Sequence, residues 1–231
     1  MSLFIAYANI TKDYPLYLMD NFSLSENINQ PSPRKKHRQV AYFLLWQLLK
    51  KAKLTESWLQ SIYRDEQGRP HFSEEHIDFN LSHSGDWVAV ALSVQPKGIN
   101  AVTAIDIEHV KRKRNYTALL AHFGTQEEQS WFQNSQFQEQ DFYQIWCLRE
   151  TILKVEGAGI GKLNSIKSFP QQCVMMTDYC PQGKAFFYRN LPFYLAFFSL
   201  QEENHISIFE WQENMLKSQD LKKDLCYQIN P

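Results

Sequence analysis

The stretch between residues 77 and 94 constrains the fold of this chain most, because it predicts two strands joined by a tight connection. Apolar and polar residues alternate over 77–82, which is typical of a strand with one buried face. Over 86–94, DWVAVALSV places valine or leucine at every second position from residue 88. Gly85 and Asp86 lie between the two patterns and suit a short turn. We therefore expect two half-buried strands here.

The rest of the chain predicts helices placed between short strands. Helices are expected over 37–52, 116–123, 126–133 and 140–157, and further strands over 3–8, 102–108, 184–188, 193–200 and 205–211. Thr125 and Glu128 fit a capping box at the start of the third helix, and residues 21–33 form a polar loop. The order predicts an α+β protein with two pseudo-symmetric halves, 1–102 and 103–231, each a small sheet packed on a helix.

Composition excludes several classes of protein. The 231 residues are 44% hydrophobic, 14% aromatic and 21% charged with a net charge of −1, which excludes a disordered polymer and argues against a general nucleic-acid binder. There is no apolar run of about 20 residues and no signal-peptide pattern, so no membrane association is expected. The four cysteines lack metal-site spacing and are interpreted as reduced thiols of a cytoplasmic protein. Positive charge is concentrated at 33–38 and 111–114, which predicts either solvated surface or a site for a polyanionic ligand.

Two carboxylates share one face of the strand expected over 102–108. Asp106 and Glu108 are two residues apart, about 7 Å along a strand, while Ile105 and Ile107 take the opposite face. Hard oxygen ligands in this number suit Mg²⁺ bound together with substrate phosphates. The same spacing is also common for an ordinary surface pair.

The helix expected over 140–157 carries Trp146, Glu150 and Lys154 at intervals of four, so they share one face. Two interpretations are open. Glu150 and Lys154 form an ion pair within the helix, or Glu150 is a third carboxylate that binds the metal and Lys154 binds a phosphate. His83, at the end of an expected strand, is either structural or, with Ser82 beside it, a phosphate contact.

Taken in order, these segments resemble the 4′-phosphopantetheinyl transferases, in particular the larger two-halved type that activates carrier proteins. The resemblance rests on GRPHF at 68–72, FNLSHSGDWVAVAL at 79–92, AIDIE at 104–108 and WCLRETILKVEGAGI at 146–160. Three residues depart from the family pattern: Arg69 and Arg149 each replace a usual Lys, and Ala104 replaces the usual Gly.

The resemblance implies transfer of the phosphopantetheine arm of coenzyme A to a serine of an acyl, polyketide or peptidyl carrier protein, with release of 3′,5′-ADP. It places the active site at the interface of the two halves, and a monomer is expected to suffice. It implies that Mg²⁺ is held by Asp106, Glu108 and Glu150. Coenzyme A is expected to contact Arg38, Arg69, Pro70, Ser82, His83 and Lys154.

The resemblance leaves the general base open between two carboxylates. Glu150 is preferred, and Glu127 is the second candidate, although Glu127 also fits a simple first-turn acid of a helix. Two other functions are compatible with the same residues. One is a Mg²⁺-dependent hydrolase of nucleotide pyrophosphates, and the other is a non-catalytic module that binds coenzyme A or a carrier protein.

Overall fold

The computed structural model describes residues 1–15 and 33–231, so the polar loop expected over 21–33 lies, except for Pro33, outside the described residues. Two sheets make up most of the fold. The first has the order β12-β11-β1-β5-β4, with β1 (Ser2–Asn9), β4 (Ile77–Ser84), β5 (Trp87–Val94), β11 (Ile206–Gln212) and β12 (Met215–Gln219). The second has the order β6-β10-β9-β13-β8-β7, with β6 (Thr103–Glu108), β7 (Lys167–Phe169), β8 (Val174–Met176), β9 (Gly183–Tyr188), β10 (Tyr194–Ser199) and β13 (Leu225–Ile229).

The other elements are short except for two helices. The helices are α1 (Pro33–Lys51), α2 (Tyr116–Leu120), α3 (Gln126–Gln133) and α4 (Gln138–Val155). A small hairpin consists of β2 (Tyr63–Arg64) and β3 (Pro70–His71), and single 3-10 turns occur at Glu56–Ser61, Ile160–Ser165, Pro170–Gln172 and Glu203–His205. The capping box at Thr125 and Glu128 is confirmed.

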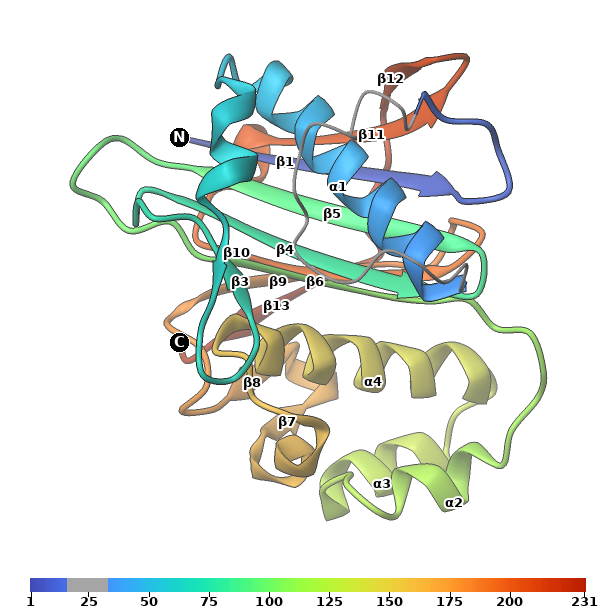
Figure 1. The fold of residues 1–231 in the computed structure, drawn as a ribbon. Coiled ribbons are helices and arrows are strands. Elements are labelled where there is room, and N and C mark those ends of the chain that lie inside the picture. Colours follow the sequence, from blue (N-terminus) through green and yellow to red (C-terminus); the bar gives the residue numbers. More distant parts are fainter. Residues whose placement is uncertain (16–32) are drawn as a thin grey trace.

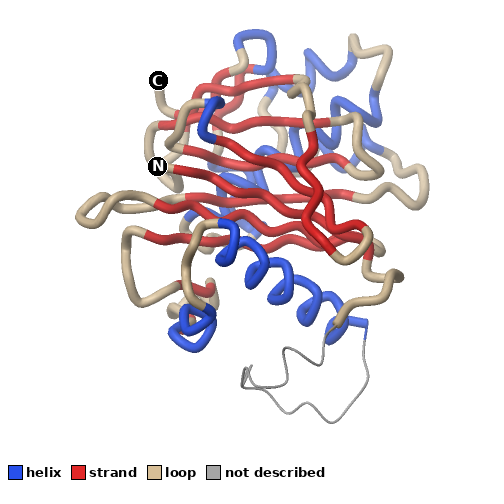
Figure 2. Tube along the Cα trace, turned by 90° about the horizontal axis from the view of Figure 1, so that it is seen from above, coloured by secondary structure: helices blue, strands red, loops and turns tan. Residues whose placement is uncertain are grey.

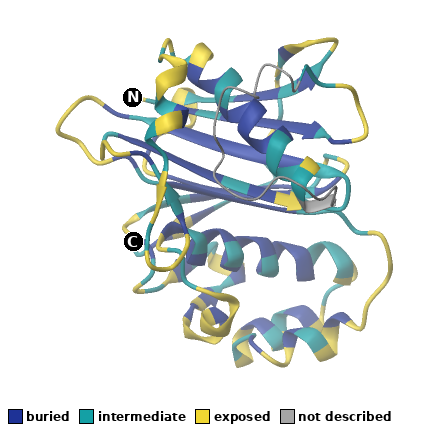
Figure 3. Cartoon of the chain, in the orientation of Figure 1, coloured by how far each residue is buried: buried dark blue, intermediate teal, exposed yellow. Residues whose placement is uncertain are grey.

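The elements stack in four layers, with α1 on the first sheet, the two sheets against each other, and α4 on the far side of the second sheet (Figures 1 and 2). Burial follows the layers, because α1 and α4 bury the faces that they turn to the sheets (Figure 3). Aromatic side chains such as Phe186, Phe193 and Phe197 fill the space between the sheets together with Ile105 and Ile107. The α+β class with a helix packed on each sheet is confirmed.

The hairpin between β4 and β5 forms as expected, with Ile77 opposite Val94, but the prediction that the two strands are only half buried was wrong. Residues 88–93 of β5 are buried on both faces, and most of β4 is buried as well. Its polar side chains Asp78, Asn80 and Ser82 are 7%, 5% and 6% exposed. They accept the backbone N–H groups of the neighbouring sheet's edge strand: Asp78 from Thr103 at 2.8 Å, Asn80 from Ile105 at 3.2 Å and Ser82 from Ile107 at 3.2 Å. Side chains therefore join the two sheets along the edges of β4 and β6.

The chain passes from the first sheet to the second between β5 and β6, and returns at its end. Strand β11 pairs parallel with β1, and β12 pairs antiparallel with β11. Residues 206–219 thus lie in the first sheet, although the expected division at 102/103 places them in the second half. In the described part of the chain, no helix is long and apolar enough to cross a membrane, and the four cysteines carry free thiols.

Candidate active site

Strand β6 turns Asp106 and Glu108 to one face, as its alternation predicted, and this face lies against α4. Ile105 and Ile107 are 0% and 1% exposed on the opposite face, where they anchor the strand between the sheets. Asp106 Oδ1 accepts hydrogen bonds from Lys154 Nζ at 2.7 Å and from Ser82 Oγ at 3.0 Å. The other oxygen, Oδ2, is buried and has no hydrogen-bond partner among the described residues. Asp106 therefore keeps one acceptor available.

Glu108 is held by two donors from different halves of the chain. Trp146 Nε1 on α4 donates to Oε1 at 2.9 Å, and Ser84 Oγ at the end of β4 donates to Oε2 at 2.8 Å. Burial and the nearby charge of Asp106 raise the pKa of Glu108, and the two hydrogen bonds act against that shift. The geometry fixes the orientation of this carboxylate.

Helix α4 brings Glu150 and Lys154 to the same place. Lys154 pairs with Asp106, and the ion pairs of the described residues include none between Glu150 and Lys154, so the intrahelical pair does not form. Burial raises the pKa of Glu150 to about 7, and the negative charges of Asp106 and Glu108 act in the same direction. A carboxyl group with this pKa exchanges a proton readily near neutral pH.

The cluster carries more negative than positive charge. The buried thiol of Cys147 lies near it, and burial together with the charges of Asp106 and Glu108 raises the pKa of that thiol well above its usual value. Lys154 is the cation that pairs with Asp106. Within residues 1–15 and 33–231, no group of three or more His, Cys, Asp or Glu side chains that could hold a metal ion is found as the side chains are placed.

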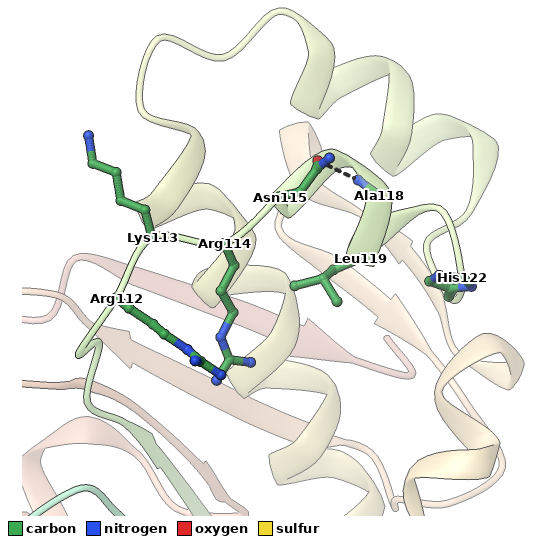
Figure 4. A pocket seen from close by; sticks show the side chains of 7 residues that line it. All are labelled: Arg112, Lys113, Arg114, Asn115, Ala118, Leu119 and His122. Carbon is green, nitrogen blue, oxygen red and sulfur yellow. Dashed lines mark hydrogen bonds between the residues drawn. The ribbon is translucent and has the colours of Figure 1, made fainter.

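Basic residues border the cluster on the loop that follows β6. A cavity of about 220 Å³ is lined by Glu108 and Ser84 together with Lys111, Arg112 and Arg114. A more open hollow of about 500 Å³ lies along the same loop and the start of α2. Figure 4 shows the ends of Arg112 and Arg114 close together, whereas Lys113 points away from them. The second basic cluster of the sequence is therefore next to the carboxylates.

The first basic cluster lies at the start of α1, beside the turn between β4 and β5. His37 Nε2 is 2.8 Å from the carbonyl oxygen of Gly85, and its ring centre is 4.8 Å from that of His83. His83 is exposed and Arg38 is half-buried. The structure thus brings His83 and the Arg38 region of α1 to the end of β4, which also carries Ser82 and Ser84.

The remaining predicted residues are placed differently. Arg69 is 7% exposed and forms a buried ion pair with Asp78 at 2.8 Å, and Pro70 lies in β3 opposite Arg64. Glu127 is exposed in the first turn of α3, and no hydrogen bond or ion pair of the described residues joins it to the cluster.

Sequence reasoning missed one buried pair completely. Arg149 and Glu128 are both 0% exposed and form an ion pair between α4 and α3, and Arg149 also donates to the carbonyl oxygens of Leu163 at 2.6 Å and Ile166 at 2.8 Å. The sequence alone marks Arg149 only as a departure from a usual Lys and Glu128 only as a capping residue. The two residues are 21 positions apart in the sequence, and no local pattern indicates that they pair.

The chain is similar in sequence to known 4′-phosphopantetheinyl transferases. The family described as the 4′-phosphopantetheinyl transferase superfamily matches residues 103–212. A Haemophilus influenzae protein, named provisionally as a 4′-phosphopantetheinyl transferase, is 42% identical over 237 aligned residues that cover 100% of both chains. The chain belongs to the 4′-phosphopantetheinyl transferase superfamily. Membership of this superfamily makes it a transferase, and the family uses coenzyme A as a substrate and acts on carrier proteins.

Two further relatives match a smaller part of the chain. The 4′-phosphopantetheinyl transferase Sfp of Bacillus subtilis is 35% identical over 96 residues, which cover 39% of this chain and 37% of Sfp. The 4′-phosphopantetheinyl transferase AcpT of Escherichia coli K12 is 33% identical over 118 residues, which cover 49% of this chain and 57% of AcpT. The family match at 103–212 includes β6 and α4, the two elements that carry Asp106, Glu108, Glu150 and Lys154.

Proposed function

We propose that this protein transfers the 4′-phosphopantetheine arm of coenzyme A to a serine hydroxyl of a carrier protein and releases 3′,5′-ADP. The observation that carries the proposal is the cluster where the two sheets meet: Asp106 bonds Lys154, and burial together with the charges of Asp106 and Glu108 raises the pKa of Glu150. In the reaction, the serine Oγ forms a bond to the phosphorus next to the pantetheine. The bond from that phosphorus to the bridging oxygen breaks, and 3′,5′-ADP leaves with this oxygen.

Mg²⁺ is the proposed metal, and Asp106, Glu108 and Glu150 are its proposed ligands. Three features support this choice: the hard carboxylate oxygens, the buried Oδ2 of Asp106 without a hydrogen-bond partner in the described part of the chain, and the like charges that raise the pKa of Glu150. When bound, the ion supplies neutralisation of the charge on the pyrophosphate. Calorimetric titration with Mg²⁺ tests this directly, and binding that is equal in Asp106→Asn and wild type would refute these ligands.

Proton transfer is assigned to Glu150. Burial and the charge of Asp106 raise its pKa to about 7 in the site without metal, so that it can accept the proton of the serine hydroxyl. Mg²⁺ bound beside it would lower this pKa. Lys154, whose side chain is 27% exposed, is proposed to donate a hydrogen bond to a phosphate oxygen. This bond would replace one of the three that its ammonium group donates to Asp106, Ser82 and the carbonyl oxygen of Ile105. Glu127 remains the second candidate for the base.

Coenzyme A is proposed to lie along the end of β4 and the start of α1. His83 and Arg38 are the proposed contacts for its phosphates, with Arg38 at the 3′-phosphate, and Pro70 is the proposed contact at the adenine end. The resemblance also implies a contact with Arg69, but this side chain is 5% exposed and paired with Asp78, so it is left out of the proposed binding site. Ser82 has a second role within the chain, because its hydroxyl donates to Asp106 and also accepts from Ile107 N and Lys154 Nζ. These bonds support a role of Ser82 in holding Asp106.

The carrier protein is proposed to dock on the basic loop 111–114 beside the site. Carrier proteins of the acyl, polyketide and peptidyl types tend to be acidic, and the loop together with α2 forms the hollow of Figure 4. A monomer with reduced cysteines in the cytoplasm is the proposed working form, because the site is built from one chain.

The deciding experiment is intact-mass spectrometry of apo carrier protein mixed with coenzyme A, Mg²⁺ and this protein. One apo carrier of each type, acyl, polyketide and peptidyl, is used. A carrier that gains the mass of the arm supports transfer. Unchanged carrier with coenzyme A consumed identifies a pyrophosphate hydrolase, and unchanged carrier with intact, bound coenzyme A identifies a binding module. Asp106→Ala is the matched inactive variant.

A further inference from the structure

Arg69 lies where the β2–β3 hairpin, β4, β6 and α4 meet. Its side chain is 5% exposed, and each of its three nitrogens donates a hydrogen bond. Nη2 donates to both carboxylate oxygens of Asp78, at 3.0 and 2.8 Å, and to the carbonyl oxygen of Thr103 at 3.1 Å. Nε donates to the carbonyl oxygen of Lys154 at 3.0 Å. One guanidinium thus binds both elements that carry the candidate active site.

Asp78 also binds β6. Its Oδ2 accepts the backbone N–H of Thr103 at 2.8 Å, so that the N–H and C=O of this residue are bound by Asp78 and Arg69 respectively. Thr103 precedes Asp106 by three residues in the same strand. Lys154 is held at two points, since Arg69 binds its carbonyl oxygen and Asp106 binds its ammonium group. The pair therefore links β6 directly to the last turn of α4.

The end of α4 is packed tightly on the turn that carries Arg69. Gly157 has a φ of +68°, and a Cβ atom there would lie 3.2 Å from Arg69 Cβ and 3.1 Å from Gln67 Cβ. His71 supports the guanidinium from the other side: its Nδ1 accepts from Arg69 Nη1 at 2.8 Å, and its Nε2 donates to Asp65 Oδ2 at 2.8 Å. These contacts leave the guanidinium little freedom to reach a ligand.

We propose that Arg69 and Asp78 are positioning residues, which place Lys154 and Asp106 for the transfer reaction without contacting coenzyme A. The inference rests on the proposed function. Arginine is needed because its planar fork reaches Asp78, Thr103 O and Lys154 O at once, whereas the single ammonium of lysine cannot. A buried ion pair is often no more stable than an apolar pair of similar volume. The contribution of this pair is then to orient β6 and the end of α4. This role explains why Arg69 occupies a position where the family has Lys.

The test measures kcat and the KM for coenzyme A in the carrier-modification assay, at a temperature where circular dichroism shows each variant to be folded. For Asp78→Asn and Arg69→Lys we expect kcat to fall by up to about 100-fold, the loss that a displacement of about 1 Å can cause. Glu213→Gln, which removes a carboxylate from the exposed pair with Lys217, is the control and keeps the wild-type kcat.

Three results would overturn the proposal. If Arg69 contacts coenzyme A, Asp78→Asn frees its charge and lowers the KM without lowering kcat, and Arg69→Lys stays active. If the pair only stabilises the fold, the double variant Arg69→Met with Asp78→Leu recovers thermal stability and kcat together, whereas we expect it to recover stability alone. The third result is unchanged amide hydrogen exchange at Thr103 in Asp78→Asn, where faster exchange is expected. This last measurement needs no activity, so it separates a failure of the positioning role from a failure of the proposed transferase function.

Discussion

The buried pair of Arg149 and Glu128 gives a prediction that depends on the fold alone. Replacing Arg149 by Met leaves the Glu128 carboxylate at 0% exposure without its cation, and breaking a buried pair in this way costs about 3–5 kcal/mol. The carbonyl oxygens of Leu163 and Ile166 lose their donor as well. For a chain of this size, about 1 kcal/mol lowers Tm by about 2–4 °C. We therefore expect Arg149→Met to unfold about 6–20 °C below wild type.

The assay is thermal unfolding followed by circular dichroism, supported by urea titration of the free energy of unfolding. Lys217→Met, which breaks the exposed pair with Glu213, is the matched control and is expected to cost less than about 1 kcal/mol. Adding Glu128→Leu to Arg149→Met removes the stranded charge and recovers part of the loss. The recovery is partial because the capping box at Thr125 disappears and two carbonyl oxygens stay without a donor. Equal Tm losses in Arg149→Met and Lys217→Met would refute the reasoning.

Three other predictions concern the candidate site. Asp106→Asn removes the charge that orients Lys154 and is expected to lower kcat by about 100- to 1,000-fold in the carrier-modification assay, with a Tm close to wild type. The rate constant kcat/KM should rise with pH and level off, because Glu150 accepts a proton only when ionised. Its pKa is raised to about 7 without metal, and Mg²⁺ in the assay should place the midpoint of the rise below that value. In Glu150→Gln, kcat/KM should fall by about 100- to 10,000-fold, and its rise with pH should disappear. If Glu150→Gln keeps the rise and Glu127→Gln loses it, the base is Glu127. Lys113→Glu should raise the KM for the carrier several-fold and weaken its dependence on salt, with the KM for coenzyme A unchanged; the exposed Lys97→Glu is the control, and equal effects of both variants would exclude docking at this loop.

Local periodicity was enough to predict the elements that carry the site. The alternation over 77–82 and 102–108 placed β4 and β6, and the interval of four put Glu150 and Lys154 on one face of α4. The common orientation of Asp106 and Glu108 follows from the period of a strand alone. Short strands such as β7, with three residues, and β8 were missed because so few residues show no period.

Contacts between distant segments could not be predicted, because no local pattern encodes them. The polar face of β4 looked solvent-exposed, but Asp78, Asn80 and Ser82 serve as acceptors for β6, about 25 residues away in the chain. The bond from Arg69 to the carbonyl oxygen of Lys154 spans 85 residues. Strand β11 joins the first sheet beside β1 although some 200 residues separate them. A polar residue in an alternating pattern can therefore face solvent or bond to a second sheet. Only the three-dimensional structure shows which of the two occurs.

The two arginines that stand in place of a usual Lys have the same physical role. Each is buried and pairs with a carboxylate, Arg149 with Glu128 and Arg69 with Asp78. Each also stabilises α4. Arg149 belongs to the helix and binds Glu128 of α3, whereas Arg69 lies outside the helix and binds the carbonyl oxygen of Lys154. Both use the fork of the guanidinium to bind several acceptors at once, which lysine does not do. Since their donors are committed inside the protein, phosphate binding must come from cations that remain accessible. His83 is exposed and Arg38 is half-buried at the proposed phosphate site, and residues 111–114 are exposed on the proposed carrier surface. Variants of these residues, rather than of Arg69 or Arg149, should weaken the binding of coenzyme A or the carrier directly.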